Sequence, residues 1–420
     1  MRKLWIDSLL GTVFIFFLIW LIYSVSALRI FNLFDPIGEA LSDMEFTDVV
    51  FSRLRETPKA DTNVVLVNIG NLSRGELAIE LNEISKHKPK VIGIDSFFSR
   101  PKEDTLGDMM LSEAIRNAGN VVMVSQLVKL NQETGNFDSV RYSHPMFSGV
   151  AADNSYANLA TDNEAVTQED FKVTRKFAPS RYISGDINNQ ELAFSVKLAQ
   201  LYDSVKTEEF LSRNQAIEAI NYRGDIKATG YDNRIKQQFT ALDVADIFTG
   251  NYVPSVFKDK IVLMGFLGRD FYDTSWEDKF FTPMNAKYAG KANPDMYGVV
   301  IHANIIAMIL NRDYVRTFPI WMDAAIGIII VFFNIMFFTV IYRKLSKWYD
   351  GVTKLFQLIE LMILLVLIIM FFHWFSLKLT LTFAFYGIAL AGDGLEVFYS
   401  VVMNLFSRMG RTQVFSLEDQ

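Results

Sequence analysis

The sequence contains no cysteine among its 420 residues. This absence excludes disulfide bonds, thiolate catalysis, iron–sulfur clusters and zinc held by cysteine. Histidine is also scarce, and its 4 copies lie too far apart to form a metal-binding cluster: His87, His144, His302 and His373. We therefore expect no metal and no cofactor. Any folded domain outside the cytoplasm has to be stabilised by core packing alone.

The sequence also lacks the signatures of two large functional classes. The net charge is −6 and there is no basic run, so nothing indicates nucleic-acid binding. No nucleophile motif occurs, and Gly265 and Gly268, which follow an apolar run, form neither a G-x-G-x-x-G fingerprint nor a P-loop. We therefore expect that the protein is not an enzyme.

Charge is missing from a long stretch near the N-terminus, where residues 8–28 are uncharged. At about 1.5 Å per residue in a helix, this stretch is long enough to cross a bilayer. A cleaved signal peptide is the alternative, because Val25, Ser26 and Ala27 form an acceptable cleavage pattern. The length of the apolar stretch, with Trp5 and Trp20 placed as interface anchors, favours a retained transmembrane anchor over residues 1–28.

Three further spans are predicted after Pro319. Residues 324–342 are uncharged, and residues 361–377 carry only His373 as a titratable side chain. Residues 379–392 are uncharged but too short to cross alone, so the last span has to continue through Asp393 and Glu396 to residue 403.

The basic residues give these spans a direction. Arg2 and Lys3 precede the first span, and the short loop between the last two spans has only Lys378. The positive-inside rule then predicts that both termini are cytoplasmic and that residues 29–317 lie outside. The predicted parts are an anchor at 1–28, a domain at 29–317, three spans at 318–403 and a tail at 404–420. The basic residues on the inner side are Arg343, Lys344, Lys347, Lys354, Arg408 and Arg411.

Residues 29–317 are predicted to form an α/β domain. Apolar runs at 64–69 and 91–94 flank a stretch with helical periodicity, and the unit repeats with a helix at 111–118 and a strand at 121–125. Strands that are apolar throughout and separated by helices indicate a parallel-type sheet with flanking helices.

The rest of this domain is predicted less regularly. A strand is expected at 260–265, a short strand at 220–223, and helices at 191–202, 241–248 and 299–310. The segments 156–159 and 171–177 suggest a hairpin or a surface excursion, and residues 46–55 fit either a short helix or an edge strand.

Polar residues follow the first two strands. Asn68 and Asn71 come after the first, and Asp95 and Ser96 after the second. Ligands of parallel sheets bind at the carboxyl ends of the strands, so these four side chains are candidate ligand contacts. The alternative is that they satisfy backbone groups in turns.

Two other groups of polar residues have both a ligand-binding and a structural interpretation. His302 and Asn304 lie on an apolar helix, as ligand contacts or as a structural polar pair. Asp273 lies in a loop with Asp270 and Asp278, but their spacing is not that of a calcium loop, so a solvated loop is favoured.

The predicted spans contain acidic residues. Asp393 and Glu396 are three residues apart and share one helix face, and Glu360 lies in the preceding span. Charges in a span usually face a partner or a water-filled site. These three residues are therefore candidates for docking a membrane partner. The alternative is that Asp393 and Glu396 lie near the interface, paired with Lys354 or Arg408.

The order of these segments resembles the CHASE2 domain, the extracytoplasmic sensor module of bacterial receptors. The resemblance covers about residues 40–316 and is carried by Asp95 within VIGIDSFF, by residues 260–265 (KIVLMG) and by residues 298–304 (GVVIHAN). Arg175 corresponds to a basic residue of the family and is, by this resemblance, a further candidate ligand contact. Acidic residues usual after the family's first strand are replaced here by Asn68 and Asn71.

The resemblance implies a sensor or regulatory subunit in the bacterial inner membrane, with its main domain in the periplasm. Receptors of this family usually continue into a kinase or a cyclase, whereas this sequence ends at Gln420. We therefore expect a separate polypeptide to read the signal, with protein partners in the membrane or envelope and homo-oligomers left open. The alternative function is a structural docking subunit of an envelope complex that binds no small molecule.

Overall fold

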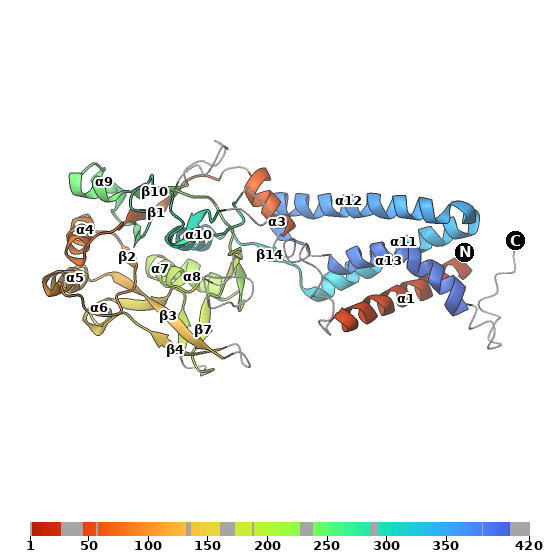
Figure 1. The fold of residues 1–420 in the computed structure, drawn as a ribbon, viewed down its shortest axis with the longest axis horizontal. Helices are drawn as coiled ribbons and strands as arrows, with labels where there is room; N and C mark the ends of the chain where they lie inside the picture. Colours follow the sequence, from red (N-terminus) through yellow and green to blue (C-terminus); the bar gives the residue numbers. More distant parts are fainter. Residues whose placement is uncertain are drawn as a thin grey trace. The chain divides into compact units, whose positions relative to one another are not determined.

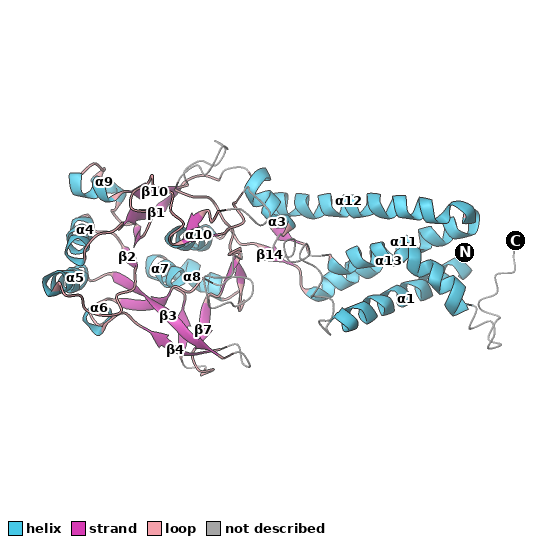
Figure 2. Cartoon of the chain, viewed as in Figure 1, coloured by secondary structure: helices cyan, strands magenta, loops and turns pink. Residues whose placement is uncertain are grey.

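The computed structural model describes residues 2–26, 45–55, 58–131, 136–159, 173–186, 189–226, 238–285, 293–379 and 381–403. Contacts divide the chain into two compact units, Phe51–Val315 and Met1–Val50 with Arg316–Gln420, which are treated separately below (Figure 1). Figure 2 shows that the first unit combines strands with helices and that the second is mainly helical. The predicted tail at 404–420 and most of the expected excursion between 160 and 172 lie outside the described residues.

The first unit is built on a seven-stranded sheet in the order β10-β1-β11-β2-β3-β4, with β5 also paired to β3. All of these pairs are parallel except β3–β4, which is antiparallel. The sheet is therefore mixed, which corrects the predicted parallel-type sheet at one edge. The connection at 131–136 is too short for a parallel crossover, so β4 has to return as a hairpin. The strands are β1 (Asp61–Asn68), β2 (Val91–Asp95), β3 (Val121–Leu130), β4 (Phe137–Arg141), β5 (Asp153–Tyr156), β10 (Phe239–Leu242) and β11 (Ile261–Gly265).

Helices cover both faces of this sheet. On one face α4 (Arg74–Lys86) and α5 (Thr105–Ala118) bury Leu81 and Ile115 against Val67 and Ile94. On the other face α7 (Phe194–Tyr202) packs against β2 and β3, and α10 (Gly298–Asn311) against β1 and β11. Strands covered on both sides need apolar residues throughout, and this explains the uninterrupted apolar runs in the sequence.

The helix boundaries follow local chemistry. Ser73 and Glu76 form a reciprocal capping box at the start of α4. The side chain of Asp104 accepts a hydrogen bond from Gly107 N at the start of α5, and Gly119 ends that helix in the left-handed conformation. The remaining helices of this unit are η2 (Val50–Leu54, which begins one residue before the unit), α6 (Pro145–Ser148), α8 (Ser204–Leu211), α9 (Val244–Thr249) and η3 (Pro254–Val256).

Several predicted elements are corrected. Tyr156 ends the parallel strand β5 and does not belong to a hairpin. Helix α9 begins three residues later than predicted, because the residues before Asp243 form the edge strand β10. Helix α7 likewise begins at Phe194, after a short strand. The region predicted as strand 220–223 is a loop after β9. The small pairs are β6 (Lys176–Phe177) with β9 (Glu218–Ala219), β7 (Ser180–Tyr182) with β8 (Gln190–Leu192), and β12 (Lys279–Phe280) with β13 (Met296–Tyr297).

In the second unit, four described helices are long and apolar enough to cross a membrane, and they coincide with the four predicted spans. They are α1 (Arg2–Ser26), α11 (Ile320–Lys344), α12 (Tyr349–Phe375) and α13 (Thr382–Val397), which the π-helix η5 (Phe398–Met403) extends. A short turn, η4 (Ser346–Trp348), leads into α12. Their composition and length place this unit in a membrane.

Small residues set the packing of these helices. A Cβ atom on Gly387 would lie 2.0 Å from Val331 of α11, and one on Gly394 would lie 2.2 Å from Ile15 of α1. Glycine at these two positions lets α13 approach both neighbours closely, as is common where membrane helices pack.

The segment before α11 and the segment before α3 (Phe46–Val49) both contact the turn between α12 and α13. Strand β14 (Arg316–Thr317), just before α11, pairs in parallel with β15 (Leu377–Lys378), between α12 and α13. Lys378 also forms an ion pair with Glu45, the residue before α3, which itself packs against α12. In the segment 46–55, which the sequence left open between a short helix and an edge strand, residues 46–54 are helical.

Candidate functional site

The register of the sheet brings the predicted polar residues to one edge. Asn68 of β1 pairs with Gly265 of β11, and Gly265 pairs with Asp95 of β2. The carboxyl ends of three adjacent strands therefore lie side by side, at the place where parallel sheets bind ligands. A Cβ on Gly265 would lie 2.7 Å from Val299, so glycine here also lets the first turn of α10 approach this edge.

Asn68 acts as a structural residue at this edge. Its side chain is completely buried and donates to Asp243 Oδ1 (2.8 Å) and to the Gly268 carbonyl (3.0 Å). Its oxygen accepts from the backbone N–H groups of Gly70 and Leu267. With both ends of the amide satisfied, Asn68 joins the loops after β1 and β11, which is the turn-satisfying interpretation. Asn71 is exposed in the turn that follows.

Asp95 differs from Asn68, because no described residue makes a hydrogen bond or an ion pair with its half-buried carboxyl group. Burial, and next the nearby charge of Asp278, raise the pKa of Asp95 to about 7. Ser96 is half-buried beside it. The edge therefore carries a carboxyl group that has no internal partner among the described residues and that titrates close to neutral pH.

Asp278 lies over the start of α10. Its backbone carbonyl accepts from Gly298 N (3.1 Å), and its carboxyl oxygens would lie 3.7 and 3.8 Å from a Cβ on Gly298. Burial, and next Glu277, raise the pKa of Asp278 to about 6. From the sequence, Asp278 is one of three aspartates in an acidic loop, and its spacing does not distinguish it from Asp270 or Asp273 as a site residue.

Asp273, the predicted ligand contact in this loop, forms its hydrogen bonds within the loop. It accepts hydrogen bonds from Arg269 N (2.9 Å), Arg269 Nε (3.2 Å) and Ser275 N (2.9 Å). These bonds hold the pKa of Asp273 well below its usual range. In the part of the chain that the structure describes, no group of three or more His, Cys, Asp or Glu side chains is placed to hold a metal ion.

The two polar residues of α10 have different environments. Asn304 is completely buried. It accepts from the N–H groups of Arg223 (2.7 Å) and Gly224 (3.3 Å), and donates to the carbonyls of Gly224 and Val300 (both 2.9 Å). His302 packs edge-on against Phe194, with ring centroids 5.4 Å apart. Burial, opposed by a hydrogen bond with the Ala157 backbone, lowers the pKa of His302 to about 4, so its ring is neutral at pH 7. Neither side chain belongs to the Asp95 edge.

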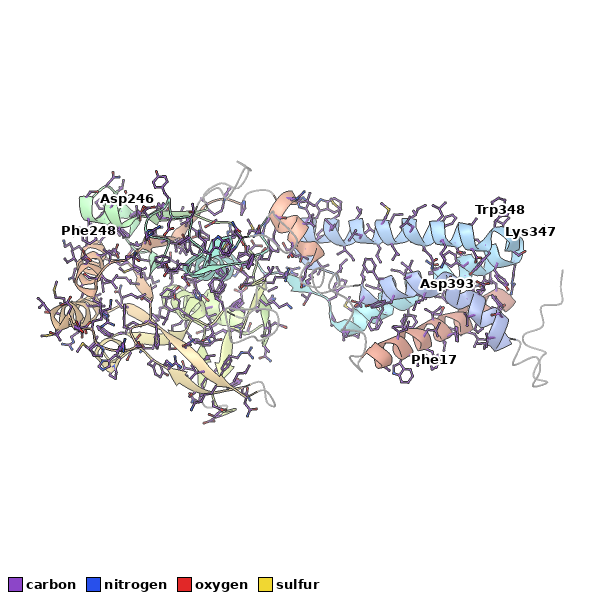
Figure 3. The ribbon with its side chains drawn as sticks, in the orientation of Figure 1. Phe17, Asp246, Phe248, Lys347, Trp348 and Asp393 are labelled. Carbon is purple, nitrogen blue, oxygen red and sulfur yellow. The ribbon has the colours of Figure 1, made fainter. Side chains whose placement is uncertain are left out.

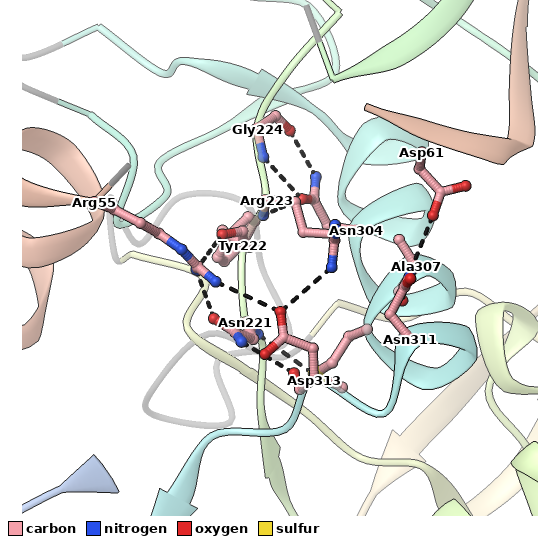
Figure 4. Close-up of polar contacts among 11 residues, drawn as sticks. Arg55, Asp61, Asn221, Tyr222, Arg223, Gly224, Asn304, Ala307, Asn311 and Asp313 are labelled. Carbon is pink, nitrogen blue, oxygen red and sulfur yellow. Dashed lines mark hydrogen bonds and ion pairs between the residues drawn. The ribbon is translucent and has the colours of Figure 1, made fainter. Parts of the chain in front are cut away.

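Asn304 belongs to a larger polar network that joins both ends of the unit (Figure 4). Arg55 Nη1 donates to Asn221 Oδ1 and to the Tyr222 carbonyl (both 2.6 Å), and Arg55 lies 3.6 Å from the Asp313 carboxylate. Arg223 also contacts Asp313, at 3.3 Å. The partners are up to 258 positions apart in sequence, so no local pattern could have predicted this network.

Arg175 lies away from the edge. Its side chain is buried, and its carbonyl accepts a hydrogen bond from Ile220 N (2.8 Å). Its positive charge acts on Tyr222, which belongs to the network around Asn304. The structure therefore does not bring Arg175 together with Asp95.

The sequence analysis missed Glu80, which is completely buried on α4. Neither of its carboxyl oxygens has a hydrogen-bond partner among the described residues. A signal existed, because position 80 falls on the same helical face as Leu77, Leu81 and Ile84. An acidic residue on an apolar stripe is unusual enough to be noted from sequence.

Two of the three membrane acids have partners within the chain. Glu360 accepts a hydrogen bond from Asn334 of α11, and Asp393 forms an ion pair with Lys354 of α12. Glu396 is exposed on α13, as is Asp393, which Figure 3 labels. Docking of a membrane partner at these residues stays a prediction, and such a partner has to compete with Asn334 and Lys354.

Comparison with known proteins gave one finding. A family model described as the CHASE2 domain matches residues 16–340, which include the whole α/β unit and parts of α1 and α11. The searches of curated proteins and of solved structures gave no match.

Proposed function

Because the chain belongs to the CHASE2 domain family, an extracytoplasmic sensor family, we propose that its α/β unit binds a ligand at the Asp95 edge and signals through a separate polypeptide. The observation that carries this proposal is the carboxyl group of Asp95. Other polar residues of the edge, such as Asn68 and Asp273, are saturated by internal hydrogen bonds, whereas Asp95 has no such partner among the described residues. A half-buried carboxyl group of this kind suits a ligand that donates hydrogen bonds or carries positive charge.

Helix α10 offers a route for the signal. It begins at Gly298 beside Asp278 and ends at Asn311, where the chain continues through Asp313 towards α11. A ligand that moved the first turn of α10 would also move its last turn, because a buried helix transmits displacement as a rigid body. The polar network around Asp313 holds that end against Arg55, which lies close to the chain's entry into the unit.

The membrane orientation is part of the proposal. Basic residues flank α1 at its start and the α11–α12 connection, and this supports cytoplasmic termini in the bacterial inner membrane with a periplasmic domain.

The test is ligand binding to the full-length chain in nanodiscs. Thermal unfolding is measured with Ca²⁺, spermidine, arginine and trehalose as probes. Asp95→Asn with Asp278→Asn should abolish any stabilisation found. Asp138→Asn, an exposed aspartate on β4, should not. A probe that stabilises the Asp95/Asp278 variant as well as the original chain would place the ligand elsewhere.

A docking subunit without a small-molecule ligand is the second candidate. It is favoured by Glu396, an acidic residue exposed on a membrane helix. Purification of the chain in mild detergent should then recover stoichiometric partners, which Glu396→Ala together with Asp393→Ala would release. Recovery of the chain alone would leave the sensor as the better explanation.

A further inference from the structure

Glu80 has an environment unlike that of any other described acid in the α/β unit. It lies in the middle of α4 with 0% exposure, and both of its carboxyl oxygens lack a hydrogen-bond partner in the described chain. A buried carboxylate without donors is far less stable than a neutral carboxylic acid in the same place. The geometry therefore favours the protonated form.

The charged residues around Glu80 do not stabilise a negative charge on its carboxyl group. Asp243, the N-cap of α9, is the charged residue that acts on it, and Asp246 follows in the first turn of α9. The two basic residues of α4 are engaged elsewhere, since Arg74 is paired with Asp108 of α5 and Lys86 with Glu83. The other titratable groups on or against α4 are Glu76, which caps the helix, and Glu83, His87 and Tyr252, which contact one another.

Asp243 connects Glu80 to the loops of the edge. Its Oδ1 accepts from Asn68 Nδ2 (2.8 Å) and Val244 N (3.0 Å), and its Oδ2 accepts from Phe271 N (3.0 Å). Through these bonds Asp243 fixes the end of β1, the start of α9 and the loop after β11. A second negative charge near Asp243 would disturb all three.

We propose that Glu80 is a proton-binding site, occupied in the folded unit, and that loss of its proton to solvent rearranges the loops held by Asp243. The ligand of this site is the proton itself. The proposal goes beyond ligand binding at Asp95 and does not depend on it, so either can fail alone.

The expected titration supports this assignment. Burial, and next the charge of Asp243, raise the pKa of Glu80 to about 8. Because the folded-state pKa lies above the ordinary value of 4.5, the bound proton stabilises the folded unit fully below about pH 4.5. That contribution is lost as the pH rises through about 8, so the transition falls near physiological pH.

The test uses Trp276, which lies in the loop that Asp243 holds and is the only tryptophan of the α/β unit. In the full-length chain in nanodiscs, the other five tryptophans are replaced by phenylalanine and emission is followed from pH 6 to pH 9.5. We expect a transition near pH 8 that is absent in Glu80→Gln, whereas any change near or below pH 7 from Asp95 or Asp278 should remain in that variant. Glu113→Gln, an exposed glutamate on α5, serves as the matched control and should keep the transition.

A second measurement is needed in case the emission of Trp276 does not respond to pH or a variant folds poorly. The urea midpoint of the α/β unit, followed by pulse proteolysis, should fall between pH 6 and pH 9, and the fall should be larger in the original chain than in Glu80→Gln or Glu80→Met. Equal falls in the original chain and both variants, or no fall in any, would overturn the proposal. A transition whose midpoint moves with Ca²⁺ or Na⁺ would also overturn it, in favour of a cation held between Glu80 and Asp243.

Discussion

Replacing Asn304 by alanine tests whether this residue supports the fold or binds a ligand. The side chain is completely buried and makes four hydrogen bonds to backbone groups of Val300, Arg223 and Gly224. Alanine would leave two N–H groups and at least one carbonyl buried without a partner. Each such group costs about 1–3 kcal/mol, although local relaxation reduces the sum. We expect a loss of about 3–5 kcal/mol in the free energy of unfolding.

The assay is pulse proteolysis of the full-length chain in micelles across a urea series, which reports unfolding of the α/β unit. A loss of this size is a large fraction of the about 5–15 kcal/mol that stabilises a typical domain. Asn71→Ala, at an exposed turn position, is the matched control and should change stability by less than about 0.5 kcal/mol. A loss below about 1 kcal/mol for Asn304→Ala, combined with loss of ligand binding, would refute the structural role.

Three further predictions follow from the described contacts. Arg74→Ala should cost about 3–5 kcal/mol at pH 7, because it leaves the Asp108 carboxylate buried without its ion-pair partner. Burial by itself raises the pKa of the Asp108 carboxyl group, but the hydrogen bond from Arg74 holds this pKa below its usual value. The urea midpoint of this variant should therefore recover relative to the original chain at pH 4, where Asp108 can take up a proton. His302→Phe should lessen the loss of stability between pH 6.5 and pH 4, because a buried ring with a pKa of about 4 resists protonation; an unchanged acid melting curve would contradict this. In whole cells, a membrane-impermeant maleimide should label Asn117→Cys directly and Ser346→Cys only after permeabilisation, and the reverse pattern would invert the proposed topology.

The strands and helices that are surrounded by apolar groups on all sides could be predicted from the sequence. Strands β1, β2 and β11 are central in the sheet and apolar on both faces, so their runs are unambiguous. The four membrane helices follow for the same reason, since the bilayer demands long apolar segments. Edge strand β10 was missed because only four residues, Phe239–Leu242, pair with one neighbour. Such a short segment has little pattern of its own.

The candidate site was predictable in position but not in detail. The edge that holds Asn68 and Asp95 follows from the rule for parallel sheets. Which acidic residue of the 270–278 loop lacks a hydrogen-bond partner among the described residues depends on the directions of backbone N–H groups, and these become known only from the fold. Asp273 receives two bonds from backbone N–H groups and a third from the side chain of Arg269, whereas Asp278 lies over α10.

The turn between α12 and α13 has a mechanical consequence. Both segments that join the spans to the α/β unit are fastened to it within the membrane unit, one through the β14–β15 pair and the other through the ion pair of Lys378 with Glu45. A pull on either segment is therefore delivered to the α12–α13 hairpin as well as to the helix that the segment continues. Because the two segments meet at one turn, a displacement of either changes the position of the same hairpin.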